Sequence, residues 1–273
     1  MGHTIDEKRV YADRTGAETV LIASERGVVV ASLSADRVGE FRLDHRTAAR
    51  DVAANGDRRA VATDEDVLVG RYEPTGFGPA VAVGFDGDDL LAAGPDGRVA
   101  RLDDGWTTLG TVETPRAVHG GMVAAADGVW MVDQGLRNVG LGDVRDVHGR
   151  GMPLAATDDG LYRLGNGWMD ERSDAFGVVS VDSAERRSAS SRTQSGDAAD
   201  DRAHAVGEDG TFVREAVGEW RAVETPGDPV DVAYTDRATV AVTEGGTLLA
   251  DAGEGWRTRE LGVGGVSALA VRG

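Results

Sequence analysis

The chain has 273 residues, with 47 Asp and Glu against 29 Lys and Arg, a formal net charge of -18 and no cysteine. The absence of cysteine excludes a disulfide framework, a thiolate metal site and a cysteine nucleophile. So acidic a chain offers no basic stripe for phosphates, and we expect no nucleic-acid partner. Its N-terminal residues lack the apolar run of a signal peptide, and no 18 apolar residues follow one another, so we expect a cytoplasmic protein without membrane contact.

An acidic turn recurs seven times along the chain. An acidic residue, usually with Gly, separates two short apolar runs at residues 24–28, 63–67, 95–99, 126–129, 158–161, 208–211 and 244–247. Tight turns between strands often need positive φ, which Gly adopts without a Cβ clash. Equivalent positions recur every 31 to 50 residues, and such self-similarity of β units indicates a propeller.

The repeat predicts an all-β fold, a seven-bladed β-propeller with about four antiparallel strands per blade. An inner strand is expected at residues 51–53, 80–83, 117–119, 146–148, 178–181, 231–233 and 266–271. Because no hairpin follows the last of these strands, we expect it to pair with the hairpin at residues 20–30 and close the ring. Residues 8–13 also resemble an inner strand and provide the alternative closure.

The whole chain, residues 1–273, is expected to form one propeller domain with one insertion. Residues 183–201 contain almost no apolar side chain, so we expect a flexible segment that is either simply tolerated or used for docking or modification. Four of the five tryptophans begin a predicted outer strand: Trp106, Trp168, Trp220 and Trp256. We expect them to fill gaps between blades, the alternative being a platform on which a sugar or base stacks.

The predicted inner strands carry the candidate ligand-binding residues, because these strands line the central channel of a propeller. His119 and His148 occupy one register position, and Asp146 lies two residues before His148, on the same side of its strand. The candidates at the channel mouth are His119, His148, Asp146, Asp51, Asp231, Arg116 and Arg145. Imidazole and carboxylate groups together suit a divalent metal or a small anion. The alternative is that they bond to neighbouring blades and water.

The hairpins, the Gly-Trp turns, the closing C-terminal strand and a composition with Lys8 as the only lysine together resemble a β-propeller family of haloarchaea. The resemblance implies the fold and a halophilic archaeal origin, and it brings no activity or site residues. Molar salt would screen the self-repulsion of so acidic a surface. A GC-rich genome that favours Arg codons is the alternative origin of the composition.

The sequence favours a binding module or scaffold, with another protein as its partner, over an enzyme. It contains no phosphate-binding loop, no Gly-x-Ser-x-Gly elbow and no His-Glu-x-x-His motif. We therefore assign no catalytic residue, no metal and no cofactor. The alternative function is a hydrolase or lyase with a His and Asp site at the central channel.

Overall fold

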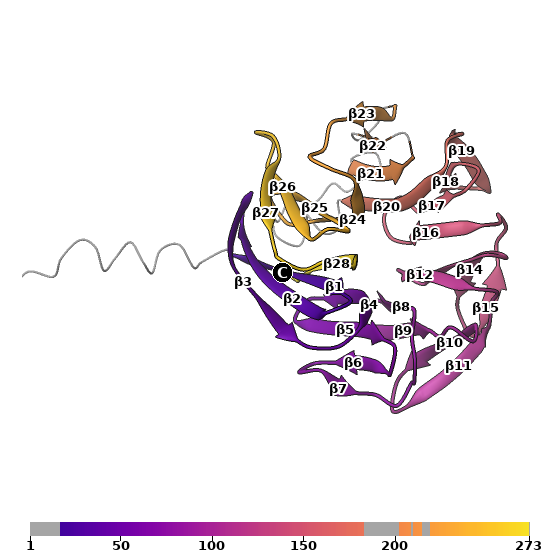
Figure 1. Ribbon diagram of the computed structural model, residues 1–273. Helices are drawn as coiled ribbons and strands as arrows, with labels where there is room; N and C mark the ends of the chain where they lie inside the picture. The colour runs from indigo at the N-terminus through magenta and orange to yellow at the C-terminus, as the bar shows by residue number, and fades with distance from the viewer. Residues whose placement is uncertain (1–16, 183–201, 209, 215–218, 273) are drawn as a thin grey trace, which may run out of the picture.

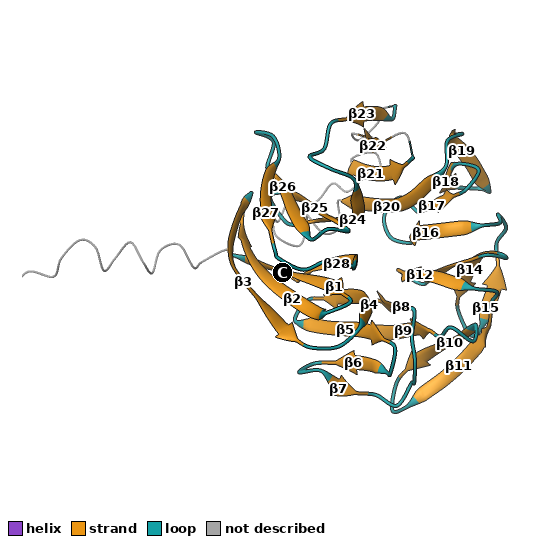
Figure 2. Cartoon of the chain, in the orientation of Figure 1, coloured by secondary structure: helices purple, strands orange, loops and turns teal. Residues whose placement is uncertain are grey.

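Seven four-stranded antiparallel sheets surround a common centre, and the innermost strand of each sheet lies nearest to that centre (Figure 1). The computed structural model describes residues 17–182, 202–208, 210–214 and 219–272. These residues form strands and loops only (Figure 2), so among them there is no helix able to span a bilayer. The predicted seven-bladed propeller is confirmed. The insertion at 183–201 and the alternative closing segment at 8–13 lie outside the described residues.

Blades 1 to 4 contain the first half of the chain and its last strand, here given from the inner to the outer strand. Blade 1 consists of β28 (Val266–Arg272), β1 (Glu18–Ser24), β2 (Gly27–Ser34) and β3 (Arg37–His45). Blade 2 consists of β4 (Ala49–Asn55), β5 (Arg58–Thr63), β6 (Val67–Val69) and β7 (Glu73–Pro74). Blade 3 consists of β8 (Ala82–Asp86), β9 (Asp89–Ala93), β10 (Arg98–Leu102) and β11 (Trp106–Thr111). Blade 4 consists of β12 (Pro115–His119), β13 (Met122–Ala125), β14 (Gly128–Val132) and β15 (Leu136–Asn138).

Blades 5 to 7 follow in the same order. Blade 5 consists of β16 (Val144–His148), β17 (Leu154–Thr157), β18 (Leu161–Leu164) and β19 (Trp168–Arg172). Blade 6 consists of β20 (Phe176–Asp182), β21 (Arg202–Gly207), β22 (Gly210–Arg214) and β23 (Arg221–Val223). Blade 7 consists of β24 (Pro229–Tyr234), β25 (Thr239–Thr243), β26 (Thr247–Asp251) and β27 (Arg257–Glu260).

The hydrophobic core lies between the blades, with one cluster at each of the seven boundaries. Strand β1 shows why: Val20 and Ile22 pack against blade 7, whereas Leu21 and Ala23 pack against blade 2. All four side chains are fully buried. A strand covered on both faces has no polar face, so the second strands read as continuous apolar runs.

The tryptophans of the predicted outer strands pack at the blade boundaries, as the sequence suggested. The boundaries between blades 2 and 3, 4 and 5, 5 and 6, and 6 and 7 contain, in that order, Trp106, Trp168, Trp220 and Trp256. The indole Nε1 of Trp168 in blade 5 donates to the Val139 carbonyl, which follows blade 4, at 2.8 Å. These side chains therefore join neighbouring blades instead of offering a free stacking surface.

The seven acidic turns lie on one face of the ring, which we call the acidic-turn face. Each joins the second and third strands of a blade, so it lies at the same end as the connection from one outer strand to the next inner strand. Gly27 has a φ of +137°, and a Cβ there would lie 1.9 Å from the His45 carbonyl oxygen. Glycine is thus required at this turn both for backbone conformation and for space. The other end of the blades forms the opposite face.

The ring is closed by pairing between the two ends of the described chain. Strand β28 lies antiparallel to β1, with Leu21 opposite Ala270 and Val20 opposite Val271. The predicted closure by residues 266–271 is therefore confirmed. It removes the open edge that β1 would otherwise present, and it contributes Leu269 to the core between blades 7 and 1.

Loss of the closing strand is expected to unfold the ring. Deleting residues 266–273 should abolish the cooperative thermal transition followed by circular dichroism, because two boundary clusters would lose their β28 side chains. The milder variant Leu269→Ala should cost about 2–4 kcal/mol of unfolding free energy. Ser267→Ala, at an exposed position of the same strand, is the control and should change it by less than about 0.5 kcal/mol. A truncated chain that melts like the full one would refute the closure.

Candidate functional site

The candidate residues of the inner strands lie at different levels along the channel. Arg50, Arg116 and Arg145 lie near the strand ends that join the acidic-turn face, whereas His119 and His148 are the last residues of β12 and β16, at the opposite face. The three aspartates occupy the level just inside the arginines, at positions 51, 146 and 231. The structure thus separates the arginines from the histidines along the strands, so the candidates do not all lie at one mouth of the channel as expected.

Each of the three aspartates ties its blade to the next one. The two oxygens of Asp51 accept hydrogen bonds from the backbone N–H of Val52 in its own strand (2.7 Å) and from that of Val83 in blade 3 (2.9 Å). Asp146 and Asp231 repeat this arrangement, their interblade donors being the N–H groups of Val179 at 2.8 Å and Leu269 at 2.7 Å. Inner strands have an unpaired edge, and these carboxylates satisfy its N–H groups.

Burial in the channel wall changes the ionisation of these carboxyls. It raises the pKa of Asp51 and of Asp146 to about 7, against the opposing effect of their backbone hydrogen bonds. The pKa of Asp231 is also well above its usual range, first through burial and then through repulsion from Asp146 and Asp51. The three carboxyls therefore interact across the channel although they belong to blades 2, 5 and 7.

The arginines of the inner strands are engaged in ion pairs on the acidic-turn face. Arg50 donates two hydrogen bonds to the Asp64 carboxylate, at 2.6 and 2.8 Å, and Arg145 binds Asp158 in the same bidentate manner. Arg116 donates to the Val144 carbonyl of blade 5 at 3.0 Å and forms a longer ion pair with Asp143, at 3.7 Å. In blades 2 and 5 an acidic turn thus pairs with the inner strand of its own blade.

The two histidines stack on each other across the boundary between blades 4 and 5. Their ring centroids are 4.0 Å apart at an interplanar angle of 29°. Nδ1 of His119 accepts the Gly149 N–H at 3.2 Å, and Nδ1 of His148 accepts the Val181 N–H of blade 6 at 3.4 Å. Burial, together with the positive charge of Arg150, lowers the pKa of His119 to about 4 and that of His148 well below its usual value. Both rings are therefore neutral at pH 7.

The described part of the chain forms no cluster of metal ligands. There, no three side chains of His, Asp or Glu approach closely enough to hold one ion. The carboxylate of Asp146 bonds to backbone N–H groups and not to His148, two residues further along β16. The channel residues consequently act first as links between blades.

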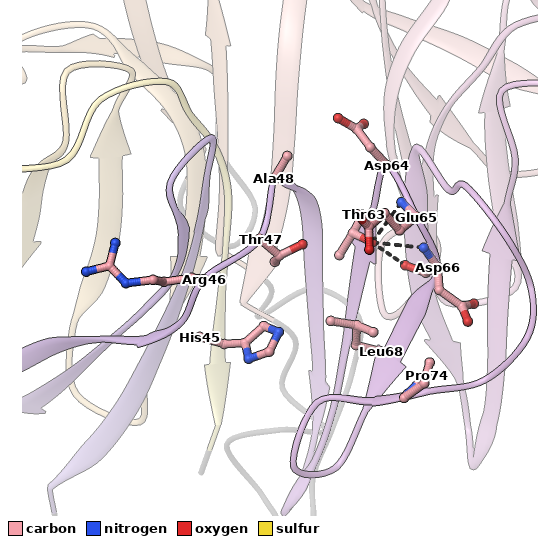
Figure 3. A pocket seen from close by; sticks show the side chains of 10 residues that line it. All are labelled: His45, Arg46, Thr47, Ala48, Thr63, Asp64, Glu65, Asp66, Leu68 and Pro74. Atoms are coloured by element: carbon pink, nitrogen blue, oxygen red, sulfur yellow. Dashed lines mark hydrogen bonds between the residues drawn. The ribbon is translucent and has the colours of Figure 1, made fainter.

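A separate pocket of about 420 Å³ lies on the acidic-turn face beside blades 1 and 2 (Figure 3). Its walls come from the end of β3 and its connection to β4, from the turn between β5 and β6, and from strands β6 and β7. The lining residues are His45, Arg46, Thr47, Ala48, Thr63, Asp64, Glu65, Asp66, Leu68 and Pro74. Figure 3 shows the imidazole of His45 and the hydroxyl of Thr47 among the lining groups, with the side chain of Arg46 directed away from the turn at 64–66.

Two of the three pocket carboxylates are held by the protein itself. Asp64 is bound by Arg50, and Asp66 accepts the backbone N–H groups of residues 76, 77 and 78 at 2.8 to 3.2 Å. Asp66 thereby fixes the connection from β7 to β8. The exposed carboxylate of Glu65 forms no bond to another described residue, so it is the pocket's available anion. The acidic turn was visible in the sequence, but the pocket beside it was not.

The imidazole of His45 is held in the pocket wall by contacts between blades 1 and 2. It stacks on the Tyr72 ring, with centroids 4.3 Å apart and planes 11° from parallel. The Tyr72 hydroxyl donates to Asp44 at 2.7 Å, and the Arg59 guanidinium lies over the same ring. Tyr72 adopts a φ of +68°, which is uncommon for a residue other than Gly. This cluster gives the pocket one rigid wall.

These features define a closed seven-bladed β-propeller with a polar channel and a pocket on its acidic-turn face. The chain belongs to the HVO_0234-like β-propeller family, whose sequence model matches residues 4–272. The resemblance to a β-propeller family is thus confirmed. A search of curated proteins finds no match to the sequence.

Several solved propellers share the fold. The WD40 propeller domain of Doa1 superposes with a TM-score of 0.57 at 17% identity, over 80% of this chain and 83% of that one. YCF48, solved bound to a D1 peptide, gives a TM-score of 0.56 at 13% identity, over 78% and 82%. A chain of the nidogen–laminin complex gives a TM-score of 0.54 at 10% identity, over 93% and 98%. At these identities the likeness shows the fold alone.

Removal of a channel carboxyl should change how stability depends on pH. A folded-state pKa above the unfolded value means that the contribution of Asp51 to stability is complete below about pH 4 and is lost as pH rises towards 7. Relative to the native chain, Asp51→Asn should therefore gain on the order of 2 kcal/mol of unfolding free energy between pH 5 and pH 8.

The control for this experiment is Asp64→Asn. A hydrogen bond from Arg50 lowers the pKa of Asp64, so the difference between this variant and the native chain should stay flat from pH 5 to pH 8. Comparing each variant with the native chain in urea titrations cancels the opposite pH dependence of the buried histidines. If the unfolding free energies of Asp51→Asn and the native chain change with pH in parallel, Asp51 titrates in the folded chain as it does in the unfolded one, and the prediction is wrong.

Proposed function

We propose that the protein is a binding module that docks a partner protein on its acidic-turn face, with a basic side chain of the partner in the pocket beside blades 1 and 2. The observation that carries this proposal is the pocket, whose volume of about 420 Å³ suits one or two side chains. Its available carboxylate, Glu65, selects a cation. The hydroxyls and the imidazole of the lining add acceptors for the N–H groups of Lys or Arg.

The surroundings of the pocket favour the same kind of partner. Exposed carboxylates stand on other turns of this face, at Glu25, Asp96 and Asp127 among others. Complementary charge steers association and sets specificity more than it sets affinity. A contact enclosed in a pocket is screened by salt less than an exposed one, so it would persist in a high-salt cytoplasm. Propellers in complexes with a peptide or a protein provide a precedent for the fold only.

The alternative of a hydrolase or lyase at the channel finds less support. General acid and base catalysis needs groups placed within hydrogen-bond reach of a reacting proton. The channel carboxylates are occupied by backbone donors, and Nδ1 of each histidine is occupied as well. The described residues offer no hydrogen-bonded Asp–His pair in the channel to start such a reaction.

A charge reversal in the pocket tests the proposed docking. The native chain, as bait in a high-salt lysate of its source organism, should retain a stoichiometric partner, and Glu65→Arg should lose it. The matched control is Glu254→Arg, the same change at an exposed turn of the opposite face. With the purified partner, Glu65→Arg should weaken binding by about tenfold or more, as expected for loss of a charged hydrogen bond.

Crosslinks between the partner and residues 46–66 should accompany this binding, and at the site of contact the partner should present Lys or Arg. Equal retention by both variants would refute the pocket as the docking point. Retention lost with Glu254→Arg but kept with Glu65→Arg would move the interface to the opposite face.

The proposed halophilic setting has its own test. Because the net charge is -18, the midpoint of thermal unfolding should rise by about 10 °C or more between roughly 0.1 M and roughly 3 M KCl, as the surface repulsion is screened. Glycine betaine at equal osmolality is the control, since it does not screen charge. An equal rise in betaine, or none in KCl, would contradict adaptation of this surface to salt.

A further inference from the structure

We propose that His119, His148 and Arg150 form a binding site for a small oxyanion at the channel mouth on the opposite face. The three side chains come from the ends of β12 and β16 and from the turn that follows β16. This site is distinct from the pocket of the proposed docking, which lies on the acidic-turn face. A phosphate, a sulfate or a small carboxylate has the chemistry that such donors recognise.

The backbone fixes which nitrogen of each imidazole carries the hydrogen. Because Nδ1 of His119 accepts the Gly149 N–H and Nδ1 of His148 accepts the Val181 N–H, both neutral rings carry their proton on Nε2. Neither Nε2–H donates to another described residue. Two stacked rings therefore supply two N–H donors that the fold leaves available, and His148 is only 9% exposed.

Arg150 supplies the positive charge at the same place. Its guanidinium donates to the Phe85 carbonyl of blade 3 at 3.2 Å, and its Cγ would lie 2.8 Å from a Cβ at Gly120 of blade 4. The side chain thus extends from blade 5 over blade 4 to blade 3. Gly120 directly follows His119, and Arg150 comes two residues after His148, so the three side chains start from neighbouring backbone positions. The positive charge of Arg150 also disfavours protonation of both histidines.

Arg150 also lacks a counter-ion of its own. Within the described residues of a chain with net charge -18, its guanidinium forms no ion pair, whereas Arg50 and Arg145 each bind a carboxylate. One N–H bond to Phe85 leaves further donors of its planar fork free. The partly buried Arg150 cation and the two imidazole N–H groups together supply the charge and the donors that an oxyanion needs. A bound oxyanion would supply the missing counter-charge.

Imidazole NMR signals of the full chain provide the test. Titration with inorganic phosphate at constant ionic strength should shift the Nε2 signals of His119 and His148 saturably, while those of His45 and His204 stay in place. The spectrum of the free protein should also show both rings as the Nε2–H tautomer. Nδ1–H tautomers, or phosphate shifts that do not saturate, would overturn the proposal.

Two variants separate binding from folding. His119→Asn can keep an oxygen acceptor for the Gly149 N–H but lacks Nε2–H, so phosphate affinity should fall by about tenfold while the melting midpoint changes little. Arg150→Gln should weaken binding at least as much, and Arg71→Gln, an exposed residue in a turn of the same face, is its control. Equal phosphate affinity in all three variants would refute an oxyanion site. Imidazole shifts with chloride as large as those with phosphate would refute it as well.

Discussion

The fold depends on burial of both faces of every sheet against its two neighbours. A four-stranded blade of this chain has no core of its own, because its second strand sends alternate side chains into two different boundaries, as Leu21 and Ile22 do. Each blade is therefore stable only when the ring around it is complete. The pairing of β28 with β1 supplies the last boundary, so the two most distant parts of the chain determine the stability of all the blades between them.

Closing the ring leaves a second requirement, at the innermost strands. Their inner edge faces the channel without a partner strand, and its N–H groups need acceptors. Asp51, Asp146 and Asp231 meet this need at three of the boundaries, by crossing from one blade to the next. The same geometry explains why conspicuous polar residues in a propeller channel need not be catalytic. Only the atoms that these hydrogen bonds between blades leave free can bind a ligand. In His119 and His148, whose Nδ1 atoms accept backbone N–H groups, the free atom is Nε2.

The architecture could be predicted from the sequence because its determinants are local. An acidic turn between short apolar runs recurs in every repeat, usually with Gly, and four repeats add Trp at the start of an outer strand. A C-terminal strand without a hairpin after it implies closure. The bounds of the inner strand of blade 3 were predicted less well. Residues 80–83 were expected there, but β8 begins at Ala82 and continues to Asp86, because its ladder with β9 extends to the Asp86–Asp89 pair.

The candidate sites were less predictable because their geometry depends on contacts between blades. Register correctly placed His119 beside His148, yet it could not show that the partners of Asp51 and Asp146 are backbone N–H groups 32 and 33 residues away. Arg150 lay just outside the repeated positions, so nothing in its sequence context indicated that it reaches Phe85. The pocket had no local signal either, since one of its walls depends on Tyr72 stacking on His45 across a boundary.

The acidic turns themselves divide into structural and available carboxylates, which bears on how the surface charge is used. Asp64 and Asp158 neutralise arginines of their own blades, and Asp66 holds a loop. Only carboxylates without such partners, Glu65 among them, can attract a cationic surface. At the mouth on the opposite face, Arg150 forms no ion pair with another described residue. What each end of the ring can bind therefore depends on which of its charged side chains the protein already pairs, more than on the net charge.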